Sequence, residues 1–232
     1  MKTIGLIGGL SWESSSEYYR IINQEVQNRL GGLHSADCLM VSFDFAEIEE
    51  LQAAGDWEAA TALMLDAAYR LERGGADCIV ICSNTMHRMA DEVEAAVGLP
   101  LIHIADATAK PILAAGHRRA GLLGTRFTME QDFYKGRMIE RFGLDVVTPD
   151  AAGRATVHRI IYDELVRGLI RGESRRRYQA VIEDLAAAGA DSVILGCTEI
   201  GLLIKPEDSA LPSFDTTELH ALAALEWALA DW

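Results

Sequence analysis

The sequence predicts an α/β fold with two pseudo-symmetric three-layer α/β domains, mainly parallel sheets and a cleft between the domains. Two observations predict it. Short apolar runs alternate with longer stretches of helical periodicity along the 232 residues, and this order of elements is typical of a parallel sheet covered by helices. One part of the pattern also occurs twice, which indicates duplicated α/β halves because the period is too long for a solenoid.

Seven apolar runs have the length of strands and end at polar or glycine residues. They cover residues 3–7, 38–42, 78–82, 101–103, 120–123, 145–148 and 192–195. Between them, apolar side chains recur at the spacing of one helix face. This spacing predicts helices around residues 18–26, 60–67, 165–170 and 217–227.

The repeat is the most informative feature of the chain. Residues 71–85 read LERGGADCIVICSNT and residues 185–199 read LAAAGADSVILGCTE, at an offset of 114. A second match, GLIGG at 5–9 with GLLGT at 121–125, has an offset of 116. The repeat and the helix pattern predict a first domain of residues 1–103 plus 217–232 and a second domain of residues 104–216.

The repeat places Ser83 opposite Cys197, each just after a predicted strand. Ligands of open α/β sheets bind beyond the carboxyl ends of the strands. Two halves that face each other would therefore present both side chains in one cleft, where a reaction could use one group on each side of a carbon atom. Adjacent strand residues point to opposite faces, so Cys82 is expected to pack in the core.

Cys197 is the chief candidate for chemistry. A cysteine at a strand end is often a small buried hydrophobe. Here it lies where apolar strand gives way to polar loop and an expected helix start, and N–H groups at a helix N-terminus lower a thiol pKa. We therefore expect a reactive thiol.

Polar residues beside the two strand ends have two compatible interpretations. Asn84, Thr85 and Thr198 are residue types that cap helices, and their donors are also suited to hold a carboxylate. His87, four residues after Ser83, and His103 either orient a site group or have structural roles.

Composition excludes several classes of function. The formal net charge of −14, from 21 basic and 35 acidic residues, argues against nucleic-acid and membrane-surface binding. The chain shows no GxGxxG fingerprint, Walker sequence or paired CxxC spacing, so neither a dinucleotide site nor a metal site is expected. Four cysteines without a disulfide pattern, and no apolar segment of membrane length, favour a cytoplasmic protein.

Four motifs in the right order resemble the aspartate/glutamate racemase family, in particular its branch of broad-specificity amino-acid racemases. The motifs are GGLSWESS at 8–15, SNTMH at 83–87, Gly124-Thr125 followed by Thr128 and Tyr134, and GCTE at 196–199. The resemblance runs the length of the chain.

The resemblance implies an enzyme without cofactor or pyridoxal phosphate, acting on an amino acid, and a homodimer. In the family, one cysteine thiolate removes the α-proton of the substrate and a second thiol returns a proton to the opposite face. It implies that Cys197 and Ser83 are the catalytic pair here, and it assigns six residues to substrate binding: Ser11, Asn84, Thr85, Thr125, Thr198 and Glu199.

Two departures from the family pattern refine these expectations. The first catalytic cysteine is replaced by Ser83, whose hydroxyl is a far poorer base than a thiol. We therefore expect Cys197 to act on the L-enantiomer and reprotonation at Ser83 to be slow. The regions around Ile48 and Glu164 are acidic or apolar where aspartate-specific members have basic residues, so aspartate or glutamate is the first expectation and a neutral amino acid such as homoserine the next.

Two other functions fit part of the pattern. A one-cysteine decarboxylase of the arylmalonate type also keeps only the second-domain cysteine. A two-lobed amino-acid-binding protein would need no reactive cysteine at all.

Overall fold

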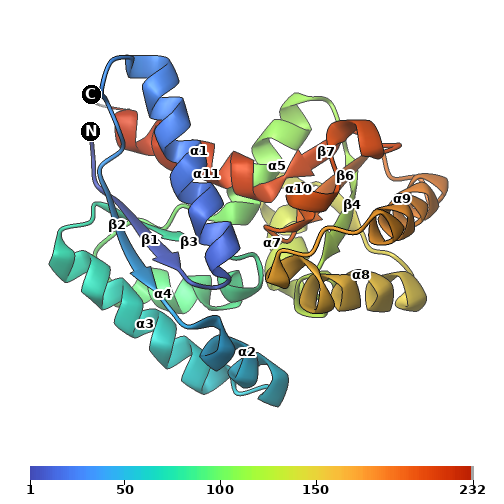
Figure 1. Cartoon of the computed structure of the whole chain (residues 1–232), viewed down its shortest axis with the longest axis horizontal. Coiled ribbons are helices and arrows are strands. Elements are labelled where there is room, and N and C mark those ends of the chain that lie inside the picture. The colour runs from blue at the N-terminus through green and yellow to red at the C-terminus, as the bar shows by residue number, and fades with distance from the viewer. Residues whose placement is uncertain (231–232) are drawn as a thin grey trace. The chain divides into compact units, whose positions relative to one another are not determined.

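A three-stranded parallel sheet forms the centre of the first of two units. The computed structural model describes residues 1–230. Contacts divide the chain into one unit made of residues 1–103 with the segment from His220 onward, and a second unit made of residues 104–219. In the first unit, β1 (Ile4–Gly8) lies between β2 (Cys38–Ser42) and β3 (Cys78–Ile81), as the labels in Figure 1 show.

Helices cover both faces of this sheet because its strands are apolar on both sides. Ile79 and Ile81 pack on one face and Cys78 and Val80 on the other. The first face is covered by α2 (Phe45–Ala54), α3 (Trp57–Gly74) and α4 (Ala90–Ala96), which follows the short η1 (Thr85–Met89). The second face is covered by α1 (Trp12–Leu30) and α11 (Thr216–Leu229).

Local sequence signals account for where these helices begin and end. The side chain of Asp44 caps α2 by accepting from the N–H of Ala46, and Asp56 caps α3 by accepting from the N–H of Ala59. Both helices end at a glycine with positive φ, Gly55 at 71° and Gly75 at 91°, a conformation that costs glycine little.

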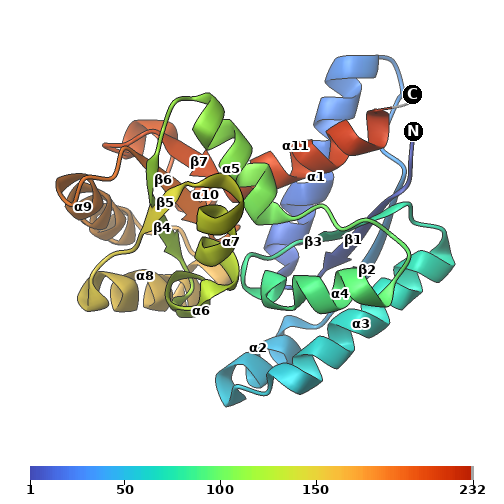
Figure 2. The ribbon, with the colours of Figure 1, turned by 180° about the vertical axis from the view of Figure 1, so that it is seen from behind.

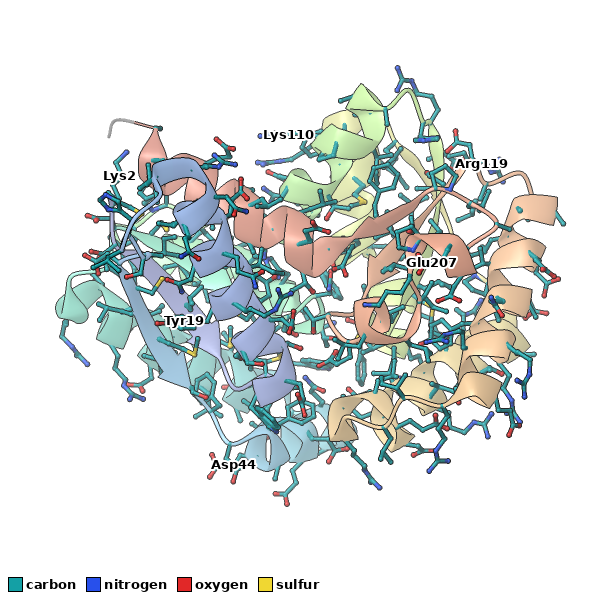
Figure 3. All side chains as sticks on the ribbon, turned by 45° about the horizontal axis from the view of Figure 1, so that its top comes forward. Lys2, Tyr19, Asp44, Lys110, Arg119 and Glu207 are labelled. Carbon is teal, nitrogen blue, oxygen red and sulfur yellow. The ribbon has the colours of Figure 1, made fainter. Side chains whose placement is uncertain are left out.

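The second unit contains a four-stranded parallel sheet of order β5-β4-β6-β7. Arg119, labelled in Figure 3, opens the first of its strands in the chain. The strands are β4 (Arg119–Gly124), β5 (Asp145–Val147), β6 (Ser192–Gly196) and β7 (Ser213–Asp215). Both sheets are therefore parallel and the predicted α/β class is confirmed.

Helices also cover both faces of the second sheet, as the labels in Figure 2 allow the reader to follow. One face packs against α5 (Ile104–Ala114) and α7 (Asp132–Phe142), the latter preceded by α6 (Arg126–Glu130). The other packs against α8 (Ala151–Asp163), η2 (Leu165–Arg167), α9 (Gly172–Ala187) and α10 (Ile200–Leu203), which η3 (Pro206–Asp208) follows.

The repeat in the sequence corresponds to equivalent positions in the two sheets. The central strand of each unit, β1 or β4, is flanked on one side by the repeat strand, β3 or β6. Asp77 and Asp191, 114 residues apart, make the same contacts: Asp77 accepts from the N–H of Thr3 at 2.7 Å and Asp191 from that of Arg118 at 2.7 Å. The two halves thus share strand order and local hydrogen bonding, as duplicated units would.

Three elements in particular differ from the sequence predictions. The expected strand at 101–103 is reduced to one parallel bridge between Leu101 and Ile79. The expected helix at 165–170 is wrong, since η2 is a single turn and Leu169 and Ile170 are exposed beyond it. Strand β7 was not predicted, because its three residues are only partly buried and carry little apolar signal.

Candidate functional site

The loop after β1 in the first unit contains Ser11, one of the expected substrate-binding residues. The hydroxyl of Ser15 donates to the carbonyl of Ser11 at 3.1 Å and accepts from the N–H of Gly9 at 2.8 Å. Gly9 has φ of 70° and lies so close to the Phe43 backbone that a Cβ would overlap it. Glycine at this position therefore allows close packing. The Ser11 hydroxyl is buried and has no hydrogen-bond partner in the described structure.

Ser83, Asn84 and Thr85 follow β3 in the same unit. The strand pairing extends to Cys82, whose N–H donates to the carbonyl of Ile7 at 2.9 Å. The Cys82 side chain is fully buried in the core beside α1 and α11, as the strand alternation predicted. The Ser83 hydroxyl accepts from the N–H of Met86 at 3.4 Å, and Ser83, Asn84 and Thr85 are all buried. The three polar side chains expected at this strand end are therefore present there and shielded from solvent.

Thr125 follows β4 in the second unit and caps its own helix. Its hydroxyl oxygen accepts from the N–H of Thr128 at 3.3 Å and lies 3.2 Å from the Thr128 hydroxyl. Neighbouring strand ends approach closely here, since a Cβ on Gly124 would lie 2.7 Å from the carbonyl oxygen of Gly196. The two glycines thus bring the loop of Thr125 beside the end of β6.

Cys197, Thr198 and Glu199 follow β6 and form a connected polar group. The Cys197 thiol donates to Oε2 of Glu199 at 2.9 Å, and the Thr198 hydroxyl donates to the same oxygen at 2.9 Å. Cys197 is 8 % exposed and Glu199 is 2 % exposed. A buried carboxylate therefore holds the thiol proton directly.

The predicted lowering of the Cys197 pKa is wrong. Burial raises the pKa of this thiol well above its ordinary value, and the adjacent Glu199 carboxylate raises it further. The N–H groups of Glu199 and Thr198 act in the opposite direction but are outweighed. Helix α10 begins only at Ile200 and has four residues, so its dipole is small. At rest the pair is a thiol hydrogen-bonded to a carboxylate.

Two threonines at the start of α11 form hydrogen bonds to the end of β6 and to the loop that follows it. The Thr216 hydroxyl donates to the carbonyl of Leu195 at 2.9 Å, and the Thr217 hydroxyl donates to that of Thr198 at 3.4 Å. Sequence reasoning missed both. Leu99-Pro100 and Leu211-Pro212 are a further match between the two halves. This match indicates that the residues after Pro212 belong to the repeat, and it would have directed attention to Thr216 and Thr217.

Sequence reasoning also missed what surrounds His87 and His103 in the first unit. The His87 ring lies 4.7 Å from that of His103 and 5.4 Å from that of His220, centroid to centroid. The Tyr18 hydroxyl oxygen lies 2.7 Å from Nδ1 of His220. All four side chains are buried, and no described His, Cys, Asp or Glu belongs to a group suited to a metal ion.

A separate cavity in the second unit contains Glu164 and none of the expected site residues. Glu164 accepts from the Ser174 hydroxyl at 2.6 Å and lies 3.7 Å from Arg171. The cavity is lined by residues of α8, α9 and the segment between them: Arg159, Ile160, Asp163, Glu164, Arg171, Glu173, Ser174 and Arg177. Glu164 therefore has arginine neighbours, among them Arg159 and Arg171, which are also close to it in the sequence. The surroundings of Glu164 are partly basic, unlike the acidic or apolar region that was expected. Within the described residues every helix is too short or too polar to span a bilayer.

Comparisons with known proteins agree on one family. The sequence model of Asp/Glu/hydantoin racemases matches residues 7–224. A broad-specificity amino-acid racemase of Bacillus subtilis, RacX, is 23 % identical over 231 residues, which cover 98 % of each chain. A crystal structure of a candidate Asp/Glu racemase from Yersinia pestis is 55 % identical, with a TM-score of 0.91 over 99 % of this chain and 100 % of that one. An aspartate racemase homologue from Pyrococcus horikoshii is 34 % identical, with a TM-score of 0.84 over 98 % and 99 % of the two chains.

Proposed function

The chain belongs to the Asp/Glu/hydantoin racemase family, and we propose that it is a cofactor-independent amino-acid racemase in which Cys197 removes the α-proton of an L-amino acid. The observation that carries this proposal is the 2.9 Å hydrogen bond from the Cys197 thiol to the buried Glu199 carboxylate at the carboxyl end of β6. It gives the thiol a proton acceptor where ligands of parallel sheets bind.

Glu199 supplies the route to a thiolate. When the thiol proton moves to Oε2, the charge passes from carboxylate to sulfur and the pair still carries one negative charge. No additional charge is then buried, so the burial that opposes simple deprotonation of Cys197 opposes this transfer far less. The thiolate then takes the substrate α-proton, leaving a carbanion and a neutral thiol. This is general base catalysis by a positioned pair.

Polar groups in each unit are suited to hold the substrate carboxylate. In the first unit, the buried Ser11 hydroxyl has no described protein partner and Asn84 and Thr85 follow β3 directly. In the second unit, Thr125 and Thr198 follow β4 and β6. The Ser11 hydroxyl would gain a partner when a carboxylate binds, and leaving a buried hydroxyl without one is costly. The other four residues are proposed from their place at the strand ends and from the family resemblance. We assign all five to substrate binding.

We propose that Ser83 takes the role that the second cysteine has in the family. Its hydroxyl, or a water molecule beside it, donates a proton to the carbanion, and solvent reprotonates the resulting alkoxide or hydroxide. Glu199 returns to solvent the proton that it took from Cys197, which restores the resting pair. The reverse step, proton removal by Ser83, is slow because an alkoxide is scarcely populated near neutral pH. Since the two enantiomers have equal free energy, the forward and reverse kcat/KM must match, and both are limited at Ser83. Exchange of the L-substrate α-proton is then faster than net racemisation.

Aspartate and glutamate are our first choice of substrate, and a neutral amino acid such as homoserine is the second. The family supports the acidic pair, and the similarity to RacX supports a wider range. Neither Ile48, which is fully buried, nor Glu164, which accepts from Ser174, carries a positive charge for a distal carboxylate, and the arginines near Glu164 line a cavity that contains none of the expected site residues. A charge-assisted partner there would contribute about 1.5–3 kcal/mol, and its lack favours broad specificity.

Compartment and assembly are further proposals. All four cysteines are free thiols in the described structure, which is compatible with the reducing cytoplasm. A homodimer is proposed from the family resemblance. Binding of nucleic acid or membrane is not proposed, because the net charge of −14 opposes both.

The proposal is tested by incubating the protein in D₂O with a panel of L- and D-amino acids and following loss of the α-proton signal by NMR. We expect exchange in L-aspartate and L-glutamate that is faster than formation of the D-enantiomer, which chiral chromatography measures. Exchange in neutral L-amino acids as well would indicate broad specificity.

Other outcomes would select the alternatives. Release of CO₂ from an aryl-substituted malonate, with amino acids left untouched, would identify a decarboxylase. Binding of an amino acid without any deuterium incorporation would identify a binding protein. Either result would overturn the racemase proposal.

Replacing Ser83 by cysteine is expected to raise net racemisation about tenfold or more, because a thiol populates its anion far better than a hydroxyl. Exchange of the L-substrate α-proton, which depends on Cys197, should change much less. The buried Ser192 in β6 provides the control, since Ser192→Cys adds a thiol away from the expected site. An unchanged rate of D-enantiomer formation in Ser83→Cys would remove Ser83 from the mechanism.

A further inference from the structure

A buried hydrogen bond ties His87 to the main chain of Ser83. Nδ1 of His87 lies 2.7 Å from the Ser83 carbonyl oxygen. A carbonyl oxygen only accepts, so Nδ1 carries the proton and donates it. His87 is 2 % exposed. The imidazole thus fixes the carbonyl of the residue whose hydroxyl we assign to reprotonation.

Neighbouring rings fix His87 in turn. The rings of His103 and His220 meet it edge to face, at 4.7 Å and 5.4 Å between centroids. His220 is held at both ring nitrogens, by the Tyr18 hydroxyl at 2.7 Å from Nδ1 and by the Ile102 carbonyl at 2.6 Å from Nε2. Because His220 is held at both nitrogens, it leaves the His87 ring little room to rotate.

His220 contributes no positive charge to this cluster. Nε2 of His220 donates to the Ile102 carbonyl, and in the neutral ring Nδ1 accepts from the Tyr18 hydroxyl. Burial lowers the pKa of His220 to about 4, so it stays neutral near pH 7. A neutral, fully hydrogen-bonded ring packs rigidly and places no cation beside the loop after β3.

We propose that His87 is a positioning residue for Ser83, and that His220 and Tyr18 hold His87 in place. The inference rests on the proposed function, in which Ser83 serves the reprotonation step. Fixing the Ser83 carbonyl fixes the peptide between Ser83 and Asn84, and with it the position from which the Ser83 hydroxyl reaches the substrate. Small misplacements of a reacting group are costly because proton transfer needs a short, aligned donor.

The test compares two replacements of His87. His87→Phe keeps a ring of similar size and removes the donor, whereas His87→Asn places an amide nitrogen near the position of Nδ1 and can donate to the same carbonyl. In His87→Phe we expect about tenfold slower formation of the D-enantiomer from L-substrate, with deuterium exchange in the retained L-substrate changed less than twofold. In His87→Asn we expect D-enantiomer formation to return to within about threefold of the unchanged protein.

The split between the two rates separates positioning from general damage. If both rates fall together in His87→Phe, or if Asn does not restore the first, the inference is wrong. If the unchanged protein shows no exchange at all, the proposed function has failed instead. Tyr18→Phe, which removes only the hydroxyl that holds His220, applies the same test should His87→Phe not fold, as judged by its melting curve. There we expect a two- to threefold loss confined to D-enantiomer formation, and equal losses in both rates would again contradict the inference.

Discussion

Replacing Cys197 by alanine is expected to lower α-proton exchange in L-substrate by about 10²–10⁴-fold, the contribution of a positioned base. The variant keeps Glu199 and the carboxylate-binding loops, but the carboxylate no longer has a thiol between itself and the substrate. Substrate affinity should change little, because the residues assigned to the carboxylate remain. Deuterium incorporation followed by NMR measures the rate, and calorimetric titration measures the affinity.

Cys82 offers a matched control for this experiment. It is a buried cysteine beside Ser83 in sequence but points into the core beside α1 and α11. Cys82→Ala should leave exchange intact and lower the melting temperature by a few degrees, since it opens a small cavity. Retained exchange in Cys197→Ala, or loss of exchange in Cys82→Ala with the fold intact, would show that the wrong thiol has been assigned.

The fold was largely predictable because its strongest signals are local. Runs such as 78–82 and 192–195 are apolar on both faces, as strands in the middle of a parallel sheet must be. The repeat at an offset of 114 relates them, and the strand period of two placed Cys82 in the core. The short segments were less predictable. Leu101 makes one bridge and β7 has three residues, and neither has a pattern that distinguishes a strand from a loop.

The candidate site was predictable only where its residues follow a strand. Ser83 and Cys197 could be selected because parallel strands end at one edge of a sheet. Residues that hold the surrounding loops in place come from elsewhere in the chain. His220 bonds to Tyr18 across 202 positions, and Thr217 reaches Thr198 from the start of α11. No local pattern joins such residues.

The Cys197 pKa shows a different limit of sequence reasoning. The position of the thiol before a polar loop predicted a lowered pKa, and the N–H groups that would lower it are present. Burial and the Glu199 carboxylate outweigh them. The burial depends on how deeply the strand end is covered, and the effect of Glu199 depends on how its side chain folds back toward the thiol. The spacing of residues in the sequence shows neither. Glu199, expected to bind substrate, is therefore assigned a second role as proton acceptor.

Glu199→Gln is expected to reduce exchange in L-substrate by about 10²-fold near neutral pH. Glutamine has almost the same shape, and its amide can still bond to the thiol, but it cannot take up the thiol proton. Removing the carboxylate also removes the charge that raises the Cys197 pKa, so in the variant the thiol should ionise by ordinary titration. The exchange rate of the variant should then rise with pH, about tenfold per pH unit below the thiol pKa, whereas the unchanged protein should show a weaker dependence in the same range.

This pH dependence distinguishes a proton acceptor from a substrate-binding residue. A residue that only bound substrate would, on replacement, raise KM and leave the pH profile of kcat as it was. The same substitution at the exposed Glu173, which pairs with Arg177 at 2.6 Å, serves as the control because it removes an equal charge from the surface. Glu173→Gln should leave both rate and profile unchanged. If Glu199→Gln lost activity by the same factor at every pH, the carboxylate would not be the acceptor of the Cys197 proton, and thiolate formation would need another route.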